Sequence, residues 1–210
     1  MLHLVVPSLK NKEKGFNLIE IAAILVIIGI AGAIGAPSLV NSRRQEQVNQ
    51  AHSRIRSALV EAQINANRLS SRCQVRFGKP GESNVINGRL VDNDNELIDL
   101  EGNTVNEANS VSCLLEEFSY PSDIVSLTRR NSSGSNFSDS PQNVTFTFQG
   151  RTSNQTIWVA RKDFNGDILP ETAKCIVISN VGMIRTGIYD TSAPSNCRNI
   201  ENDRYDSSTP

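Results

Sequence analysis

Residues 14–40 read KGFNLIEIAAILVIIGIAGAIGAPSLV, and this stretch decides what kind of chain this is. From Ile21 to Val40 the chain has 20 residues without a charge, about the length of a helix that crosses a bilayer core. A cleaved secretory signal has a shorter apolar run, and the rest of the chain is too polar to bury such a helix. We therefore interpret residues 16–42 as a membrane-spanning helix. Glu20 lies just inside it, where a bilayer penalises a carboxylate by about 2.5–3.5 kcal/mol.

The composition indicates one globular domain in addition to this helix. The chain has 210 residues, of which 38% are hydrophobic and 5% aromatic, and its formal net charge is −1. A net charge near zero argues against a dedicated nucleic-acid-binding protein. Serine, asparagine and threonine are frequent after residue 80, which favours turn-rich β structure.

After Pro37 the pattern changes to that of an amphipathic helix. Apolar residues recur at steps of three and four along one face, a spacing typical of a helix that packs on a core: Val48, Ala51, Ile55, Leu59, Ala62, Ala66 and Leu69. Charged residues between them, including Arg54 and Glu61, are expected on the solvated side. The sequence predicts one long helix from about Phe16 to Leu69, with residues 43–70 as its amphipathic half.

Strands and turns are expected in residues 71–197. The segment CQVRF from Cys73 alternates apolar and polar residues, and RLVD (89–92) is a second candidate strand. In NVTFTFQG (143–150), Val144, Phe146 and Phe148 are expected on one buried face. TIWVARK (156–162) and KCIVISNVGMIRTGIYD (174–190) supply further strands, while residues 198–210 are expected to form a flexible tail. The expected class is α+β, with a helix packed on an antiparallel β domain.

Four cysteines, Cys73, Cys113, Cys175 and Cys197, all lie in the β domain. Because no two of them form a C-x-x-C pair, a zinc ribbon or a thioredoxin-type site is not indicated. An even number in an exported domain favours two disulfides over four buried free thiols. Spacing alone does not determine the pairing. We favour the sequential arrangement, 73–113 and 175–197.

The segment KGFNLIE, followed by a long apolar run, resembles the processing motif of type IV pilins and pseudopilins. The resemblance implies that residues 1–15 are a leader peptide that stays in the cytoplasm. In that family, prepilin peptidase cuts after the glycine and methylates the new amine, so the cut is expected between Gly15 and Phe16. Gly29 and Pro37 match positions where pilin helices loosen in the filament. Asn17 replaces the threonine that is commoner in the family.

The resemblance gives Glu20 an assembly role. The family places this carboxylate against the processed amine of a neighbouring subunit, which here is the amine of Phe16. A buried charge is tolerated when an opposite charge pairs with it. The alternative is a glutamate at the membrane interface that reaches water.

The C-terminal half resembles a narrower group, the FimT and H-type minor pilins and pseudopilins, notably cyanobacterial ones. In that group a strand is followed by Ser-x-x-Gly and an arginine-bearing strand. Ser179, Gly182 and Arg185 match this pattern.

Two kinds of ligand site are considered in the β domain. DFNGD places oxygen ligands at Asp163, Asn165 and Asp167, as a calcium loop does, but Ile168 stands where an EF-hand has glycine. A plain hairpin turn is favoured there, and no cofactor other than calcium is considered. Some related minor pilins bind DNA through a Gly-Arg-x-Arg patch. Arg151 and Arg185 are the candidate contacts, and dispersed surface charge is favoured instead.

Catalysis is not expected, because the two histidines, His3 and His52, lie in the leader and on the helix. The resemblance implies a minor type IV pilin that serves assembly, motility, adhesion or DNA uptake. The alternatives are a type II secretion pseudopilin and a membrane-anchored binding module that does not polymerise. Implied partners are other pilins, prepilin peptidase, the inner-membrane assembly platform and the membrane itself. The implied location is a single pass in the inner membrane with an exported domain, then a filament at the cell surface.

Overall fold

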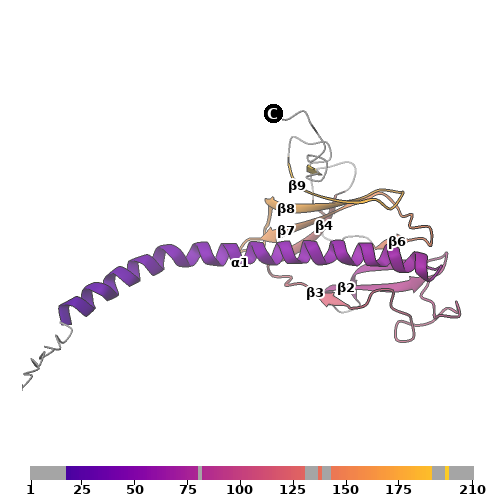
Figure 1. Cartoon of the computed structure of the whole chain (residues 1–210), viewed down its shortest axis with the longest axis horizontal. Helices are drawn as coiled ribbons and strands as arrows, with labels where there is room; N and C mark the ends of the chain where they lie inside the picture. Colours follow the sequence, from indigo (N-terminus) through magenta and orange to yellow (C-terminus); the bar gives the residue numbers. More distant parts are fainter. Residues whose placement is uncertain (1–17, 80–81, 131–136, 139–142, 191–196, 199–210) are drawn as a thin grey trace, which may run out of the picture. The chain divides into compact units, whose positions relative to one another are not determined.

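The structure is a computed structural model that describes residues 18–79, 82–130, 137–138, 143–190 and 197–198. The side chains of residues 31–38, 79, 82–83, 129–130 and 137–138 lie outside this description. The chain divides into two compact units, Met1–Ser42 and Arg43–Pro210. One helix, α1 (Leu18–Arg68), agrees with the long helix predicted from about Phe16 to Leu69 (Figure 1). Among the described residues, no helix meets the combined length and apolarity needed to cross a membrane.

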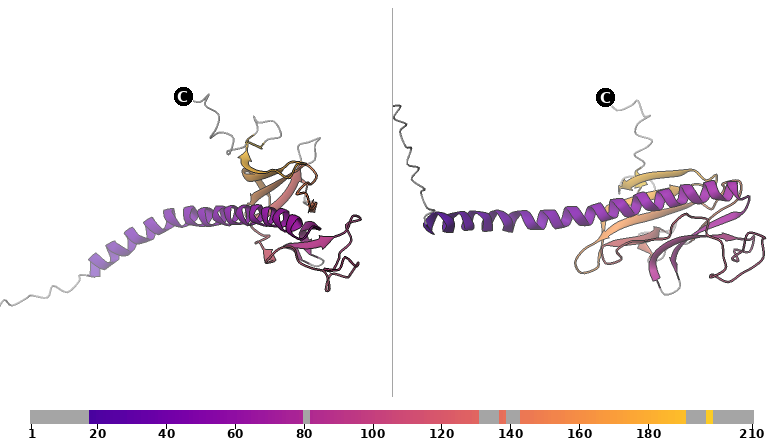
Figure 2. Two further views of the ribbon diagram at one scale, coloured as in Figure 1. Left: turned by 45° about the vertical axis from the view of Figure 1, so that its right-hand side comes forward. Right: turned by 60° about the horizontal axis from the view of Figure 1, so that its bottom comes forward.

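Within the described residues, ten strands form two antiparallel sheets. Their bounds are β1 (Arg72–Lys79), β2 (Glu82–Val91), β3 (Phe118–Ser119), β4 (Val125–Arg130), β5 (Phe137–Ser138), β6 (Val144–Phe146), β7 (Gln155–Lys162), β8 (Ile168–Ile178), β9 (Ile184–Tyr189) and β10 (Cys197–Arg198). The first sheet has the order β3-β2-β1-β6, and the second has the order β10-β9-β8-β7-β4-β5. The second half of α1 lies along both sheets (Figure 2). The α+β class, with a helix packed on antiparallel sheets, is therefore confirmed.

The main core lies between this half of α1 and the two sheets. Six of the seven apolar positions picked out by their spacing are buried, from Val48 to Ala66, and Leu69 packs against them. The sheets contribute alternate residues, such as Val75 in β1 and Ile157 in β7. Because side chains alternate across a strand, these residues face the helix while their neighbours face away. The helical spacing therefore marks the residues that join the helix to both sheets.

The C-terminal end of α1 is closed by a Schellman motif. The Ser71 N–H donates to the Ala66 carbonyl (3.1 Å), and the Ser70 N–H donates to the Asn67 carbonyl (3.2 Å). Ser70 occupies the left-handed position with φ 50°, where glycine is usual. This motif ends the helix and turns the chain directly into β1.

A second, smaller cluster lies on the face of the six-stranded sheet that points away from α1. It contains Trp158, Ala160, Ala173 and Cys175, with Tyr189 packed against it. The rings of Trp158 and Tyr189 meet edge to face, with centroids 5.7 Å apart. Strand β7 is therefore buried on both faces, and Trp158 lies in a core.

The strands of the structure differ from the predicted ones in several places. Strand β6 has three residues, so Phe148 falls in the turn that follows and is 51% exposed rather than buried. Strand β8 begins at Ile168, earlier than the predicted start at 174. Strand β2 begins at Glu82 rather than near residue 89, and strands β3, β4 and β5 were not predicted. The tail from residue 199 lies outside the described residues.

Candidate functional site

The first turns of α1 present apolar side chains on all sides. Leu18 is 84% exposed, Leu25 is 63% exposed and Ile27 is 66% exposed. Glu20 lies in the first turn of the helix and is also exposed. A helix that is hydrophobic all round is normally covered by protein or lipid. This segment therefore requires a partner that is not part of the described chain.

Of the other residues of the predicted assembly site, the structure describes the backbone of Gly29 and Pro37. Gly15 and Phe16 lie outside the described residues. A Cβ built at Gly29 meets no atom within 4 Å, so the backbone there is open to close approach. The helix runs through Pro37, although proline lacks the N–H that would bond to the carbonyl four residues earlier.

The second half of α1 is tied to the sheets through backbone carbonyls. The His52 Nε2–H donates to the Cys175 carbonyl (3.3 Å), and the Asn65 side-chain amide donates to the Cys113 carbonyl (2.8 Å). The side-chain amide of Gln63 donates to two carbonyls, those of Gly150 and Gly182, at 3.0 Å each. Polar side chains therefore fix the helix at several points along the β domain.

The sequence did not predict these hydrogen-bonding side chains of α1, because the prediction considered only the spacing of apolar residues. Glu61 was expected on the solvated side. It is instead half-buried, and its carboxylate accepts a hydrogen bond from the Leu115 N–H at 2.6 Å. The available signal was the group of amide side chains at 63, 65 and 67, next to buried positions on the same helix.

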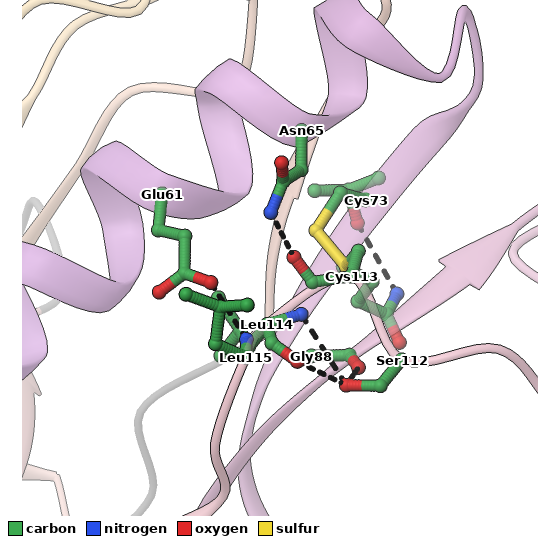
Figure 3. The surroundings of a disulfide bond; sticks show 10 residues. Glu61, Asn65, Cys73, Gly88, Ser112, Cys113, Leu114 and Leu115 are labelled. Atoms are coloured by element: carbon green, nitrogen blue, oxygen red, sulfur yellow. Dashed lines mark hydrogen bonds between the residues drawn. A yellow bond between two sulfur atoms is a disulfide. The ribbon is translucent and has the colours of Figure 1, made fainter.

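Figure 3 shows how α1 meets the first disulfide. Cys73 of β1 is bonded to Cys113, whose carbonyl accepts the hydrogen bond from Asn65. A Cβ at Gly88 would lie 2.5 Å from Cγ of Leu114, so the segment after Cys113 can pack on β2 only over a glycine. The helix, two strands and this segment are thus joined at one point.

The second disulfide joins Cys175 of β8 to Cys197 of β10. It also lies beside a glycine, because a Cβ at Gly187 would meet the Arg198 carbonyl and would be 3.0 Å from Sγ of Cys175. The two bonds are the sequential pairs favoured from the sequence. Beside each bond, a glycine lets a segment lie close to a sheet where a side chain would obstruct it.

Among the described residues, five connections share one hydrogen-bonding pattern, which we call the repeated turn. In each, the first residue donates its N–H to the carbonyl of the fifth, and its side-chain oxygen accepts the N–H of the fifth. The fourth residue has a positive φ, between 65° and 92°. The repeated turns are residues 92–96, 99–103, 147–151, 163–167 and 179–183. Asp, Ser or Thr at the first position supplies the oxygen, and Gly or Asn suits the fourth.

The repeated turn accounts for the two motifs singled out in the β domain. In 163–167, Oδ1 of Asp163 accepts the N–H groups of Asn165 and Asp167 at 2.8 Å each, so the alternating oxygens serve a hairpin. Calcium binding there stays an untested prediction. Within the described residues, no three His, Cys, Asp or Glu side chains gather as a metal site would require. Ser179 and Gly182 are the first and fourth residues of another repeated turn.

The two candidate DNA contacts lie in different settings. Arg151 is exposed at the last position of the repeated turn 147–151. Arg185 lies in β9, is half-buried, and has its Nε 2.9 Å from Sδ of Met183. The structure brings Arg151 together with a different arginine, Arg72, in a polar groove.

Comparisons with known proteins identify the family. No protein-family model matches the chain. The type IV narrow pilus major component PilA5 of Thermus thermophilus is 32% identical over 87 residues, which are 40% of this chain and 74% of that protein. The type IV minor pilin FimU of Pseudomonas aeruginosa PAO1 has 13% identity and a TM-score of 0.45, covering 73% of this chain and 96% of that chain. On the similarity to PilA5, this chain belongs to the type IV pilin family.

Proposed function

We propose that this chain is a minor type IV pilin, a non-catalytic structural subunit that joins a filament through α1. The observation that carries the proposal is the start of α1, where apolar side chains are exposed around the helix and Glu20 lies in the first turn. In a member of the pilin family, the helices of neighbouring subunits would cover this surface. The similarity to PilA5, which is named as a major component of a narrow type IV pilus, also supports a role as a pilus subunit.

The proposal includes maturation by prepilin peptidase. Residues 1–15 would be removed as a leader, and the amine of Phe16 would be methylated. Residues 16–42 would then serve as the assembly helix, in the inner membrane before assembly and in the filament afterwards. Residues 43–70 and the β domain would be exported and displayed at the cell surface. The partners would be other pilins and the inner-membrane assembly platform.

The minor role is proposed from the irregular part of the β domain. Between the end of β2 at Val91 and the start of β3 at Phe118, the chain forms isolated bridges and turns, two of which are repeated turns. Such a segment suits a subunit that meets specific partners rather than one that repeats along the whole filament.

Processing is tested by the intact mass and N-terminal sequence of the protein extracted from membranes or sheared filaments. We expect a chain that begins at methylated Phe16 and lacks residues 1–15. A chain that retains Met1, in cells with an active prepilin peptidase, would contradict the proposal and leave an anchored domain that does not polymerise.

The role of Glu20 is tested by Glu20→Ala. Removing one partner of a buried charge pair costs about 3–5 kcal/mol, so the variant should be processed normally but be strongly depleted from sheared filaments. The matched control is Glu171→Ala, which removes an exposed carboxylate from β8. Immunoblots of the filament and membrane fractions measure both. Equal incorporation of the two variants would show that Glu20 has no role in assembly.

A further inference from the structure

A polar groove of about 380 Å³ lies where three of the repeated turns converge. The turn 92–96 contributes Asn95, the turn 147–151 contributes Arg151, and the turn 179–183 contributes Asn180. The floor comes from the two adjacent strands β1 and β6, with Arg72 at the start of β1 and Thr145 in β6. Loops that cluster on a rigid scaffold are a frequent setting for binding sites.

Two of the residues that line the groove have a buried polar atom without a hydrogen-bond partner among the described residues. Arg72 is held in place because its Nη1 donates to the carbonyls of Asp92 (3.1 Å) and Asn93 (2.7 Å). Its Nε is buried and makes no hydrogen bond with a described residue, and the same is true of the Thr152 hydroxyl. A buried polar group without a partner is costly, so each such atom calls for an explanation. Both atoms are closed to solvent, so a ligand in the groove would meet the other polar groups that line it.

The described residues that line the groove all have polar side chains. Each of them is an arginine, an asparagine, a threonine or a serine. Two guanidinium groups, those of Arg72 and Arg151, suit a carboxylate or a sulfate, which accept paired hydrogen bonds from arginine. The amides and hydroxyls both donate and accept, as the hydroxyls of a sugar do. The absence of a carboxylate among the described lining residues disfavours a cation.

Nucleic acid fits this groove less well than a sugar does. Proteins that bind single strands stack the bases on aromatic side chains, and no aromatic residue is among the described residues that line the groove. The volume also suits one or two sugar units, since small-molecule sites measure roughly 300–1,000 Å³.

The rim of the groove is fixed before any ligand arrives. The side-chain amide of Gln63 donates to the carbonyls of Gly150 and Gly182, which belong to two of the three converging turns. The Thr152 N–H also donates to the Asn180 carbonyl (3.2 Å), which links the same two turns again. A preorganised site loses less entropy when it binds. We propose that this groove binds an acidic sugar, a carboxylated or sulfated unit of a polysaccharide, and this inference does not depend on the role in pilus assembly.

The test is calorimetric titration of the full chain in detergent with four probes. These are trigalacturonate, galactose 6-sulfate, neutral galactotriose and inorganic phosphate. We expect one or both acidic sugars to bind in a salt-dependent manner, and the two of them distinguish carboxylate from sulfate. Galactotriose should bind about tenfold more weakly, because it leaves the charge-assisted hydrogen bonds unmade.

Three variants locate the binding. Arg151→Ala removes an exposed guanidinium from the groove, and Asn180→Ala removes an exposed side-chain amide from it while the backbone carbonyl of Asn180 stays in place. Each should weaken binding of the acidic sugar about tenfold while thermal unfolding stays that of the unsubstituted chain. Arg43→Ala, which removes an exposed arginine of α1, should leave binding unchanged.

Several results would overturn the inference. Equal binding of galactotriose would show that the arginines do not select an acid. Binding of phosphate as tight as that of the acidic sugars would show that the sugar hydroxyls contribute nothing. An equal loss in Arg43→Ala would indicate unspecific charge attraction. Tighter binding of a single-stranded oligonucleotide, lost in Arg151→Ala, would assign the groove to nucleic acid instead.

Discussion

At the scale of the residue, glycine is required for two separable reasons in the repeated turns. Gly102 has φ 84° and Gly182 has φ 81°, so both backbones lie in the left-handed region that other residues avoid. Their surroundings differ. A Cβ at Gly102 would meet nothing within 4 Å, whereas a Cβ at Gly182 would lie 1.9 Å from the carbonyl oxygen of Gly150.

The two glycines therefore form a matched pair of variants. Gly102→Ala should lower the free energy of unfolding by about 1 kcal/mol, the cost of a left-handed alanine alone. Gly182→Ala should lower it by about 3 kcal/mol or more, because overpacking against a backbone atom is added to that cost. Urea unfolding followed by circular dichroism measures both. Equal losses in the two variants would show that the contact with Gly150 is not rigid.

At the scale of the element, α1 meets the six-stranded sheet through a histidine. His52 donates a hydrogen bond to the Cys175 carbonyl of β8, between the helix and the sheet. Burial lowers the pKa of His52 below its ordinary value of 6.5, and the positive charges of Lys174 and Arg56 lower the pKa further. The hydrogen bond to Cys175 opposes that shift. The neutral imidazole is therefore the form that fits the junction.

The lowered pKa of His52 predicts acid sensitivity of this junction. As the pH falls through 6.5, the unfolded chain takes up the proton before the folded chain does, so stability falls until the lower folded pKa is passed. His52→Gln keeps a donor for the Cys175 carbonyl but cannot titrate. Thermal unfolding between about pH 7.5 and about pH 5, limits that bracket the ordinary pKa, should show a steeper loss for the unsubstituted chain than for the variant. Parallel curves would exclude His52 as the cause.

At the scale of the whole molecule, the two disulfides belong to different cores. Cys73 and Cys113 are buried in the main core, 0% and 2% exposed, beneath α1. Cys175 lies in the outer cluster, and Cys197 packs against it from β10. Strand β10 pairs with β9 through two residue pairs only. The first bond therefore constrains the packing of the helix, and the second holds one edge of a sheet.

Removing each bond should have a different consequence. A disulfide contributes roughly 2–4 kcal/mol, chiefly by restricting the unfolded chain. Replacing Cys73 and Cys113 by serine should cost most of that amount and lower the unfolding temperature of the whole β domain. Replacing Cys175 and Cys197 should cost less, because β10 gains freedom in the folded state as well. Hydrogen exchange should then rise in β9 and β10 alone, and a uniform rise over both sheets would contradict this assignment.

The sequence by itself determined the features that repeat along a single element. The spacing from Val48 to Leu69 predicted the buried face of α1, because a helix that packs on one side must place apolar residues every three or four positions. Alternation located β1 in the same way. The Ser-x-x-Gly pattern at Ser179 and Gly182 was taken from the resemblance to the family. These two residues form a repeated turn, because the serine hydroxyl accepts a backbone N–H and the glycine has a positive φ.

Only the tertiary structure decided which distant segments meet. Gln63 joins two turns that lie 87 and 119 residues further along the chain, and no local pattern encodes that meeting. The exposure of Phe148, the hydrogen bond of Glu61 to Leu115 and the groove between Arg72 and Arg151 likewise depend on where the sheets place their ends. The physical reason is that periodicity records whether a residue faces a core. The identity of its neighbours is set by strand order and register, which are properties of the whole fold.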